Sequence, residues 1–116
     1  MTHMSVTWED VVEFAVTLPE VAESTSYGTP ALKVAGTLMG RLRTDAEGWL
    51  ALKCSTADKA SLVEGPDPAF STTPHYDGHD YVLVDLELVD RQELLELVED
   101  AWRIAAPATV RKQRDA

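Results

Sequence analysis

The chain has 116 residues, of which 45% are hydrophobic, and its 10 basic side chains stand against 20 acidic ones, which gives a formal net charge of −10. This length suits one domain, and the apolar share is high enough to form a core, which excludes a disordered acidic chain. The acidic balance argues against nonspecific binding to nucleic acid or to an anionic membrane, because such binding needs clustered Lys and Arg. The single cysteine, Cys54, excludes an internal disulfide and any multi-cysteine metal site.

The N-terminal part predicts a helix, a connector and a turn. Thr7 and Asp10 are spaced as a capping box, and apolar residues then recur at helical intervals until Pro19 ends the helix. The polar segment 20–26 is expected to be a connector. It leads into a turn at 27–30, where glycine and proline favour a change of chain direction.

The middle of the chain predicts three strands and a short helix. The strands are three apolar runs separated by short turns, at residues 31–35, 38–43 and 49–54. A second capping pattern at Ser55 predicts a helix that ends near Glu64, because glycine and proline residues follow it.

The last third predicts two more strands and a long helix. The strands are expected at 69–73 and 81–88. Asp90 begins a helix whose wide apolar stripe continues until Pro107. The basic segment 108–116 is expected to be a flexible tail.

The predicted element order is therefore α-β-β-β-α-β-β-α. Short connections between the early strands favour a mainly antiparallel sheet of five strands with helices on one face, which is a two-layer α+β sandwich. Residues 1–107 are expected to form its one domain. We expect a cytoplasmic protein without a membrane span, because no leader pattern and no long apolar stretch is present. The sequence allows either Met1 or Met4 as the natural start.

Strand alternation predicts which side chains the helices leave uncovered. The positions expected to face the helices are Leu32, Val34, Leu38, Leu42, Leu50, Leu52, Cys54, Val82, Val84 and Leu86. The opposite, open face is expected to carry Met39 and four basic residues, Lys33, Arg41, Arg43 and Lys53, close to Trp49. One interpretation is an exposed face on which Asp85 and Glu87 pair with some of the cations. The other is a platform that binds anions or nucleic acid, with Trp49 as a stacking surface.

The sequence contains no recognisable catalytic motif. A serine nucleophile elbow, a phosphate-binding loop, a dinucleotide fingerprint and a zinc-protease helix are all absent, so we do not expect an enzyme. His75 and His79 lie in a loop with too few further ligands, so neither a metal nor a cofactor is expected. Cys54 is expected to be a buried apolar thiol, unless His75 lies beside it.

Two turns, at 27–30 and 73–76, each combine rigid backbone with an aromatic hydroxyl next to a strand. They supply a candidate pocket made of Tyr27, Thr29, His75 and Tyr76. One interpretation is structural, with the tyrosines covering an edge of the core. The other is a small-anion pocket in which His75 and Tyr76 converge with Lys53.

Five segments, in order along the chain, resemble the MmcQ/YjbR family. They are YGTPALKV at 27–34, LALKC at 50–54, TPHY at 73–76, DAWR at 100–103 and AP at 106–107. The resemblance implies a small bacterial α/β protein of secretion-chaperone-like type, in a family whose members are described as DNA-binding. The positions that match are Tyr27, Thr29, Lys33, Lys53, His75, Tyr76 and Trp102. Trp102 lies on the apolar stripe of the last helix and is expected in the core.

Three functions remain open at the level of the sequence. The first is binding of DNA or another nucleic acid through Lys33, Arg41, Arg43 and Lys53, with Trp49 nearby. The second is a protein-interaction or chaperone-like module that holds a protein partner or a second copy of the chain. The third is binding of a small anion in the pocket around His75 and Lys53.

Overall fold

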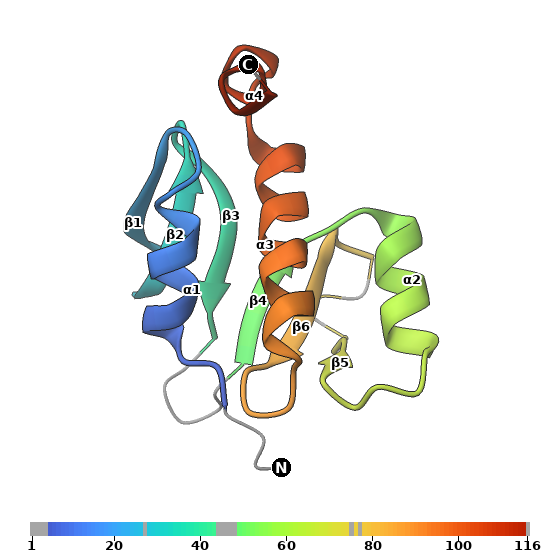
Figure 1. Cartoon of the computed structure of the whole chain (residues 1–116). Coiled ribbons are helices and arrows are strands. Elements are labelled where there is room, and N and C mark those ends of the chain that lie inside the picture. Colours follow the sequence, from blue (N-terminus) through green and yellow to red (C-terminus); the bar gives the residue numbers. More distant parts are fainter. Residues whose placement is uncertain (1–4, 27, 44–48, 75, 77, 116) are drawn as a thin grey trace.

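One antiparallel sheet of six strands, in the order β1-β2-β3-β4-β6-β5, organises the fold within the described residues (Figure 1). The computed structural model describes residues 5–26, 28–43, 49–74, 76 and 78–115. The strands are β1 Val21–Ser26, β2 Thr29–Val34, β3 Thr37–Leu42, β4 Trp49–Lys53, β5 Phe70–Ser71 and β6 Tyr81–Asp85. The helices are α1 Trp8–Ala15, α2 Thr56–Glu64, α3 Arg91–Ala105 and α4 Ala108–Asp115.

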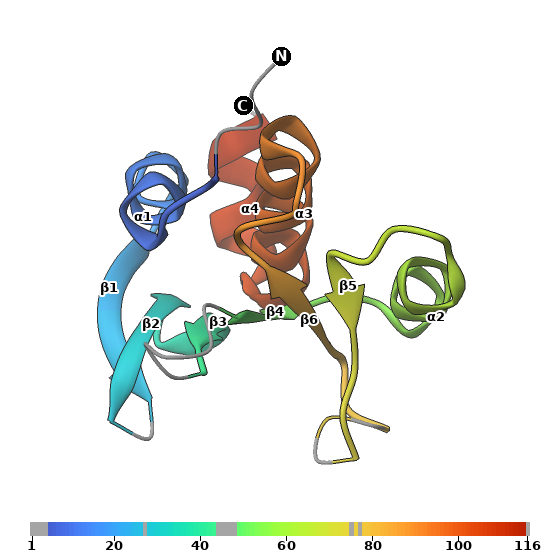
Figure 2. The ribbon, with the colours of Figure 1, turned by 90° about the horizontal axis from the view of Figure 1, so that it is seen from below.

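The helices α1, α3 and α4 lie on one side of the sheet, as Figure 2 shows. α3 packs on β3 and β4 and against α1, while α2 lies at the edge beside β5 and β6. On the other side, the end of the β1–β2 hairpin and the segment between β5 and β6 project away from the helices (Figure 2). The α+β class with an antiparallel sheet is therefore confirmed.

Local capping sets the start of each of the first three helices, as predicted. The hydroxyl of Thr7 and the carboxylate of Asp10 form a capping box at α1, with bonds of 3.1 and 3.0 Å. The hydroxyl of Ser55 and the carboxylate of Asp90 accept from backbone amides at the starts of α2 and α3. These bonds satisfy amides that a helix start leaves unpaired. Since the two partners lie three residues apart, a short sequence pattern is enough to predict them.

The expected connector at 20–26 is instead the edge strand β1. It pairs with β2 along its whole length, from Val21 opposite Val34 to Ser26 opposite Thr29. The prediction was wrong because an edge strand packs only lightly on the core and carries polar residues without clear alternation. Between the two strands, Gly28 has a φ of +78°, a conformation that glycine adopts without strain.

The alternation predicted for β3 is wrong at two positions. The register between β2 and β3 shifts by one residue, so that Leu32 pairs with Gly40 but Lys33 pairs with Leu38. Met39 therefore turns inward and is fully buried in the core, while Leu38 lies on the side of Lys33. A bulge of this kind reverses the faces on one side of it and leaves Arg41 on the open face as expected.

The segment after Pro107, expected to be a flexible tail, forms the helix α4. Its Val110 is buried, and the Arg111 guanidinium donates to the carbonyl oxygens of Arg103 and Ala106 at the end of α3. The Glu99 carboxylate also accepts from Arg114 at 2.7 Å. These contacts join α4 to α3, which explains why the basic composition of the segment alone did not indicate order.

The core lies between the sheet and α3, with Trp102 as its largest fully buried side chain. Its indole Nε1 donates to the carbonyl oxygen of Pro19 at 2.9 Å, so the ring also joins α3 to the end of the α1 segment. The inward positions predicted on β4 and β6 are confirmed, because Leu50, Leu52, Val82 and Val84 all belong to this core.

We expect Trp102→Ala to lower the free energy of unfolding by about 3–5 kcal/mol, because it leaves a large cavity under α3. Trp102→Phe should lower the free energy of unfolding by less. About 1–2 kcal/mol of this loss comes from the Pro19 carbonyl, which no longer has a donor, and the rest comes from a smaller packing loss. Urea denaturation measures both values. Ile104→Ala, at a residue of the same helix that is 42% exposed, should change stability little. A Trp102→Ala variant as stable as Ile104→Ala would contradict this account of the core.

We also expect acid to release α4 from α3 before the rest of the protein unfolds. Hydrogen bonding to Arg114 lowers the pKa of Glu99, and hydrogen bonding to Arg103 lowers the pKa of Asp115. A carboxyl whose pKa is lower in the folded state stabilises that state above its ordinary pKa, and this contribution is lost as the pH falls through the lowered value.

Backbone NMR signals of residues 108–115, followed from pH 7 to pH 2, measure the release of α4. Glu99→Gln should loosen α4 already at neutral pH, whereas Glu96→Gln, at a residue that forms no ion pair with any described residue, should not. Signals of α4 that stay unchanged in Glu99→Gln and in acid would contradict the assignment.

Candidate functional site

The open face of the sheet carries the predicted basic residues, and we call Arg41, Arg43, Lys53 and Trp49 the cationic face. Arg41 lies in the centre of the sheet, paired with Ala31 on one side and with Ala51 on the other. Directly paired residues of neighbouring strands share a face. Trp49 pairs with Asp85, and Lys53 pairs with Tyr81, so both flank this central row on the same face.

The segment 72–80 between β5 and β6 covers the centre of this face through Tyr76. The Tyr76 side chain is 6% exposed and packs on Ala51 and Leu83, apart from the main core on the helical side. The Arg41 guanidinium donates to the Tyr76 hydroxyl at 2.6 Å and lies 3.4 Å from the Thr29 hydroxyl oxygen. Thr29 and Tyr76, which come from the two candidate turns, therefore meet at Arg41.

Cations and aromatic rings alternate across the face. The guanidinium carbons of Arg41 and Arg43 lie 6.0 and 5.8 Å from the centroid of the Tyr76 ring. Tyr76 meets Tyr81 edge to face, with centroids 6.4 Å apart, and the Lys53 ammonium lies 5.2 Å from the Tyr81 centroid. These distances fit cation–π contacts, which hold flexible basic side chains in place. Tyr81 was not among the predicted site residues, although its position next to the inward-facing Val82 indicates this face.

Lys33 lies apart from this group. It pairs with Ala22 on one side and with Leu38 on the other, so the whole of β3 separates it from Lys53 on β4. Two strand spacings amount to about 10 Å between backbones. Tyr27 and His75 lie outside the described residues, so a pocket of His75 with Lys53, or a contact of His75 with Cys54, stays a prediction.

Both layers of the protein carry acidic and basic residues. α1 and α3 carry many of the carboxylates, namely Glu9, Asp10, Glu13, Glu93, Glu96, Glu99 and Asp100. Ion pairs between described residues, such as Arg91 with Asp10 and Arg103 with Glu99, lie in the helical layer. On the sheet, the Asp85 carboxylate accepts from the backbone amide of Glu87 at 3.0 Å. Within the described part of the chain, neither Asp85 nor Glu87 forms an ion pair with Lys33 or Lys53.

Cys54 faces the core at the end of β4 and is only 4% exposed. Burial raises the pKa of its thiol to about 11, although the nearby Lys59 charge acts in the opposite direction. A thiol of this kind is almost entirely protonated at neutral pH and is a poor nucleophile. Cys54 therefore belongs to the core, as expected, and not to the site.

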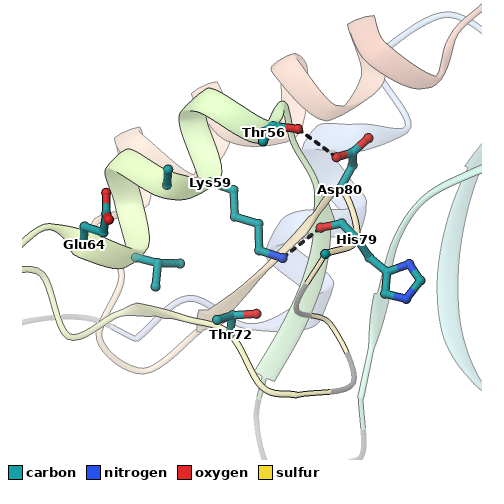
Figure 3. Close-up of a pocket in the computed structure, with 9 residues that line it drawn as sticks. Thr56, Lys59, Glu64, Thr72, His79 and Asp80 are labelled. Carbon is teal, nitrogen blue, oxygen red and sulfur yellow. Dashed lines mark hydrogen bonds between the residues drawn. The ribbon is translucent and has the colours of Figure 1, made fainter.

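A cavity of about 290 Å³ lies between α2 and the segment 72–80 (Figure 3). Its lining includes Thr56, Lys59, Val63, Thr72, His79 and Asp80. The Lys59 ammonium donates to the carbonyl oxygens of Tyr76 and His79 at 2.6 and 2.8 Å. Sequence reasoning missed Lys59, and the available signal was its position four residues before Val63 on the packed side of α2. Among the described side chains, no group of three His, Cys, Asp or Glu is arranged to hold a metal ion.

The chain matches the family model described as YjbR over residues 16–104, which is most of its length. The chain belongs to the YjbR family. The resemblance expected from its five sequence segments is thus confirmed. This match includes every member of the cationic face, together with Tyr76 and Lys59.

Three uncharacterised mycobacterial proteins, one from Mycobacterium bovis and two from Mycobacterium tuberculosis, are similar to part of this YjbR-family chain. Each is 39% identical over 49 residues, which cover 42% of this chain and 38% of the relative. The matching segment thus spans well under half the length of each relative. The described helices include none that is both long and apolar enough for a bilayer crossing.

We expect the Cys54 thiol to resist alkylation in the folded protein. A pKa of about 11 leaves roughly one thiol in a thousand ionised at pH 8, and burial blocks access as well. Mass spectrometry after iodoacetamide treatment should show modification only when urea is present. Because Cys54 is the only cysteine, each adduct reports on it directly. Fast modification without urea would show that β4 opens or that the thiol is activated.

Proposed function

We propose that the cationic face binds single-stranded nucleic acid through local contacts to phosphates and bases. The observation that carries the proposal is the grouping of Arg41, Arg43 and Lys53 on one sheet face beside the half-buried rings of Trp49 and Tyr81. The buried Tyr76 ring lies under the two arginines and holds them in place. Proteins that bind single strands combine backbone-tracking cations with rings on which bases stack. Lys53 beside Tyr81 and the half-buried Trp49 extend the same combination along β4.

A single strand suits this face better than a duplex does. Specific duplex binding usually needs an element that enters a groove, together with a broad basic surface. The cationic face instead presents three basic residues on the central strands, and the whole chain carries a net charge of −10. The proposed binding is therefore local and of modest affinity. Membership of the YjbR family assigns no ligand to the site.

A fluorescent oligothymidylate, titrated with the protein at several salt concentrations, measures the binding by anisotropy. With three cationic contacts, the logarithm of the affinity should fall with the logarithm of the salt concentration at a slope of about −2. Arg43→Gln combined with Lys53→Gln should weaken binding at least tenfold at low salt and reduce the slope by about 1.4, because two contacts are lost.

Arg91→Gln combined with Lys112→Gln is the matched control, since it also removes two positive charges, both from exposed side chains of the helical layer. It should leave both the affinity and the slope nearly unchanged. Absence of binding by the folded protein at low salt would refute the proposal, and so would an equal loss in the control variant. If a mononucleotide binds as tightly as the oligonucleotide, the ligand of the face is a small phosphate compound and not a single strand.

A further inference from the structure

Among the described residues, Lys59 is the charged residue that is buried, with 9% exposure. It does not belong to the cationic face. Burying an ammonium is unfavourable unless hydrogen-bond acceptors replace the lost water. The described acceptors of Lys59 are two backbone carbonyl oxygens, those of Tyr76 and His79. Both oxygens belong to the segment 72–80, so the buried ammonium binds that segment to α2.

The same segment presents Tyr76 to the open face. Tyr76 is bound at two ends, because its carbonyl oxygen accepts from Lys59 and its hydroxyl oxygen accepts from Arg41, each at 2.6 Å. Lys59 comes from α2 and Arg41 from β3, so the two cations reach the residue from different elements. Both bonds therefore help to hold Tyr76 in its position.

The cavity beside α2 makes the two Lys59 hydrogen bonds more important for the position of the segment 72–80. In Figure 3, the Lys59 side chain extends from α2 to the carbonyl of His79, with open space on the side lined by Thr72 and Glu64. A cavity of about 290 Å³ means that side-chain packing does not fill the space between α2 and the segment. The other described bond across this space joins the exposed Thr56 hydroxyl and Asp80 carboxylate at 3.2 Å.

We propose that Lys59 is a positioning residue for the cationic face: its ammonium fixes the segment 72–80 and so holds the Tyr76 ring between Arg41 and Arg43. This inference rests on the proposed function where it concerns affinity for nucleic acid. The part that concerns the position of the segment does not need any ligand. Lys59 itself touches no residue of the cationic face in the described contacts.

Lys59→Met tests the first part without nucleic acid, because methionine keeps an unbranched apolar stem but has no ammonium. Amide hydrogen exchange across 72–80 should become at least about tenfold faster, since local opening no longer breaks the two charged hydrogen bonds. Lys59→Arg should restore slow exchange, because the guanidinium keeps the charge and the cavity has room for it. Lys112→Met is the matched control and should leave exchange in this segment unchanged.

A double-mutant cycle tests the second part with the oligothymidylate. Lys59→Met should weaken binding about five- to tenfold in the wild-type background. In a Tyr76→Phe background, where the bond to Arg41 is already absent, it should weaken binding less than about twofold. A residue with only a general structural role would give the same factor in both backgrounds.

The outcomes separate the inference from the proposed function. If the wild-type protein does not bind the oligonucleotide, the proposed function fails, while hydrogen exchange still tests how Lys59 holds the segment. Unchanged exchange in a folded Lys59→Met protein overturns the inference, and so does an additive cycle. If Lys59→Met does not fold, Lys59→Gln replaces it, because the shorter neutral amide still loses the charge of both hydrogen bonds.

Discussion

The pleat of β4 determines both the core and the candidate site. Leu50 and Leu52 must face α3 to be buried, and period-two alternation then forces Trp49, Ala51 and Lys53 to the opposite face. Helices cover the first face, whereas among the described residues the second is covered where the segment 72–80 lays Tyr76 on Ala51 and Leu83. One-sided burial of the sheet is therefore the constraint from which the cationic face follows.

Elements governed by neighbouring residues were the ones that the sequence predicted well. The starts of α1, α2 and α3 depend on caps within three residues of each other, and the faces of β4 and β6 depend on simple alternation. The elements that were missed depend on distant partners. β1 is a strand because β2 offers it a free edge, and α4 is held by Glu99 and by the carbonyls that end α3. The bulge at Met39 depends on how β2 and β3 pair, which no pattern within β3 reveals.

The candidate site divides in the same way. Alternation was sufficient to place Arg41 and Lys53 on one face, because only the pleat decides that side. The cover over this face could not be predicted, since it depends on bonds from Lys59 and Arg41 to Tyr76 across 17 and 35 positions of sequence. A turn containing a tyrosine gives no indication of which distant cation its carbonyl and hydroxyl will meet. The sequence could thus suggest the cations of the site but not how their positions are fixed.

The net charge of −10 does not by itself exclude a local anion-binding face, because nearby charges act on a ligand more strongly than distant ones. Seven of the 20 carboxylates sit on α1 and α3, which cover the side of the sheet opposite the cationic face. At physiological ionic strength the Debye length is about 8 Å, so exposed charges on the helical side are largely screened there. Among the described residues, the charges nearest a ligand on this face include those of Arg41, Arg43 and Lys53 and the carboxylate of Asp85. Overall charge therefore limits how fast and how tightly a polyanion can bind, while the sheet determines where it binds.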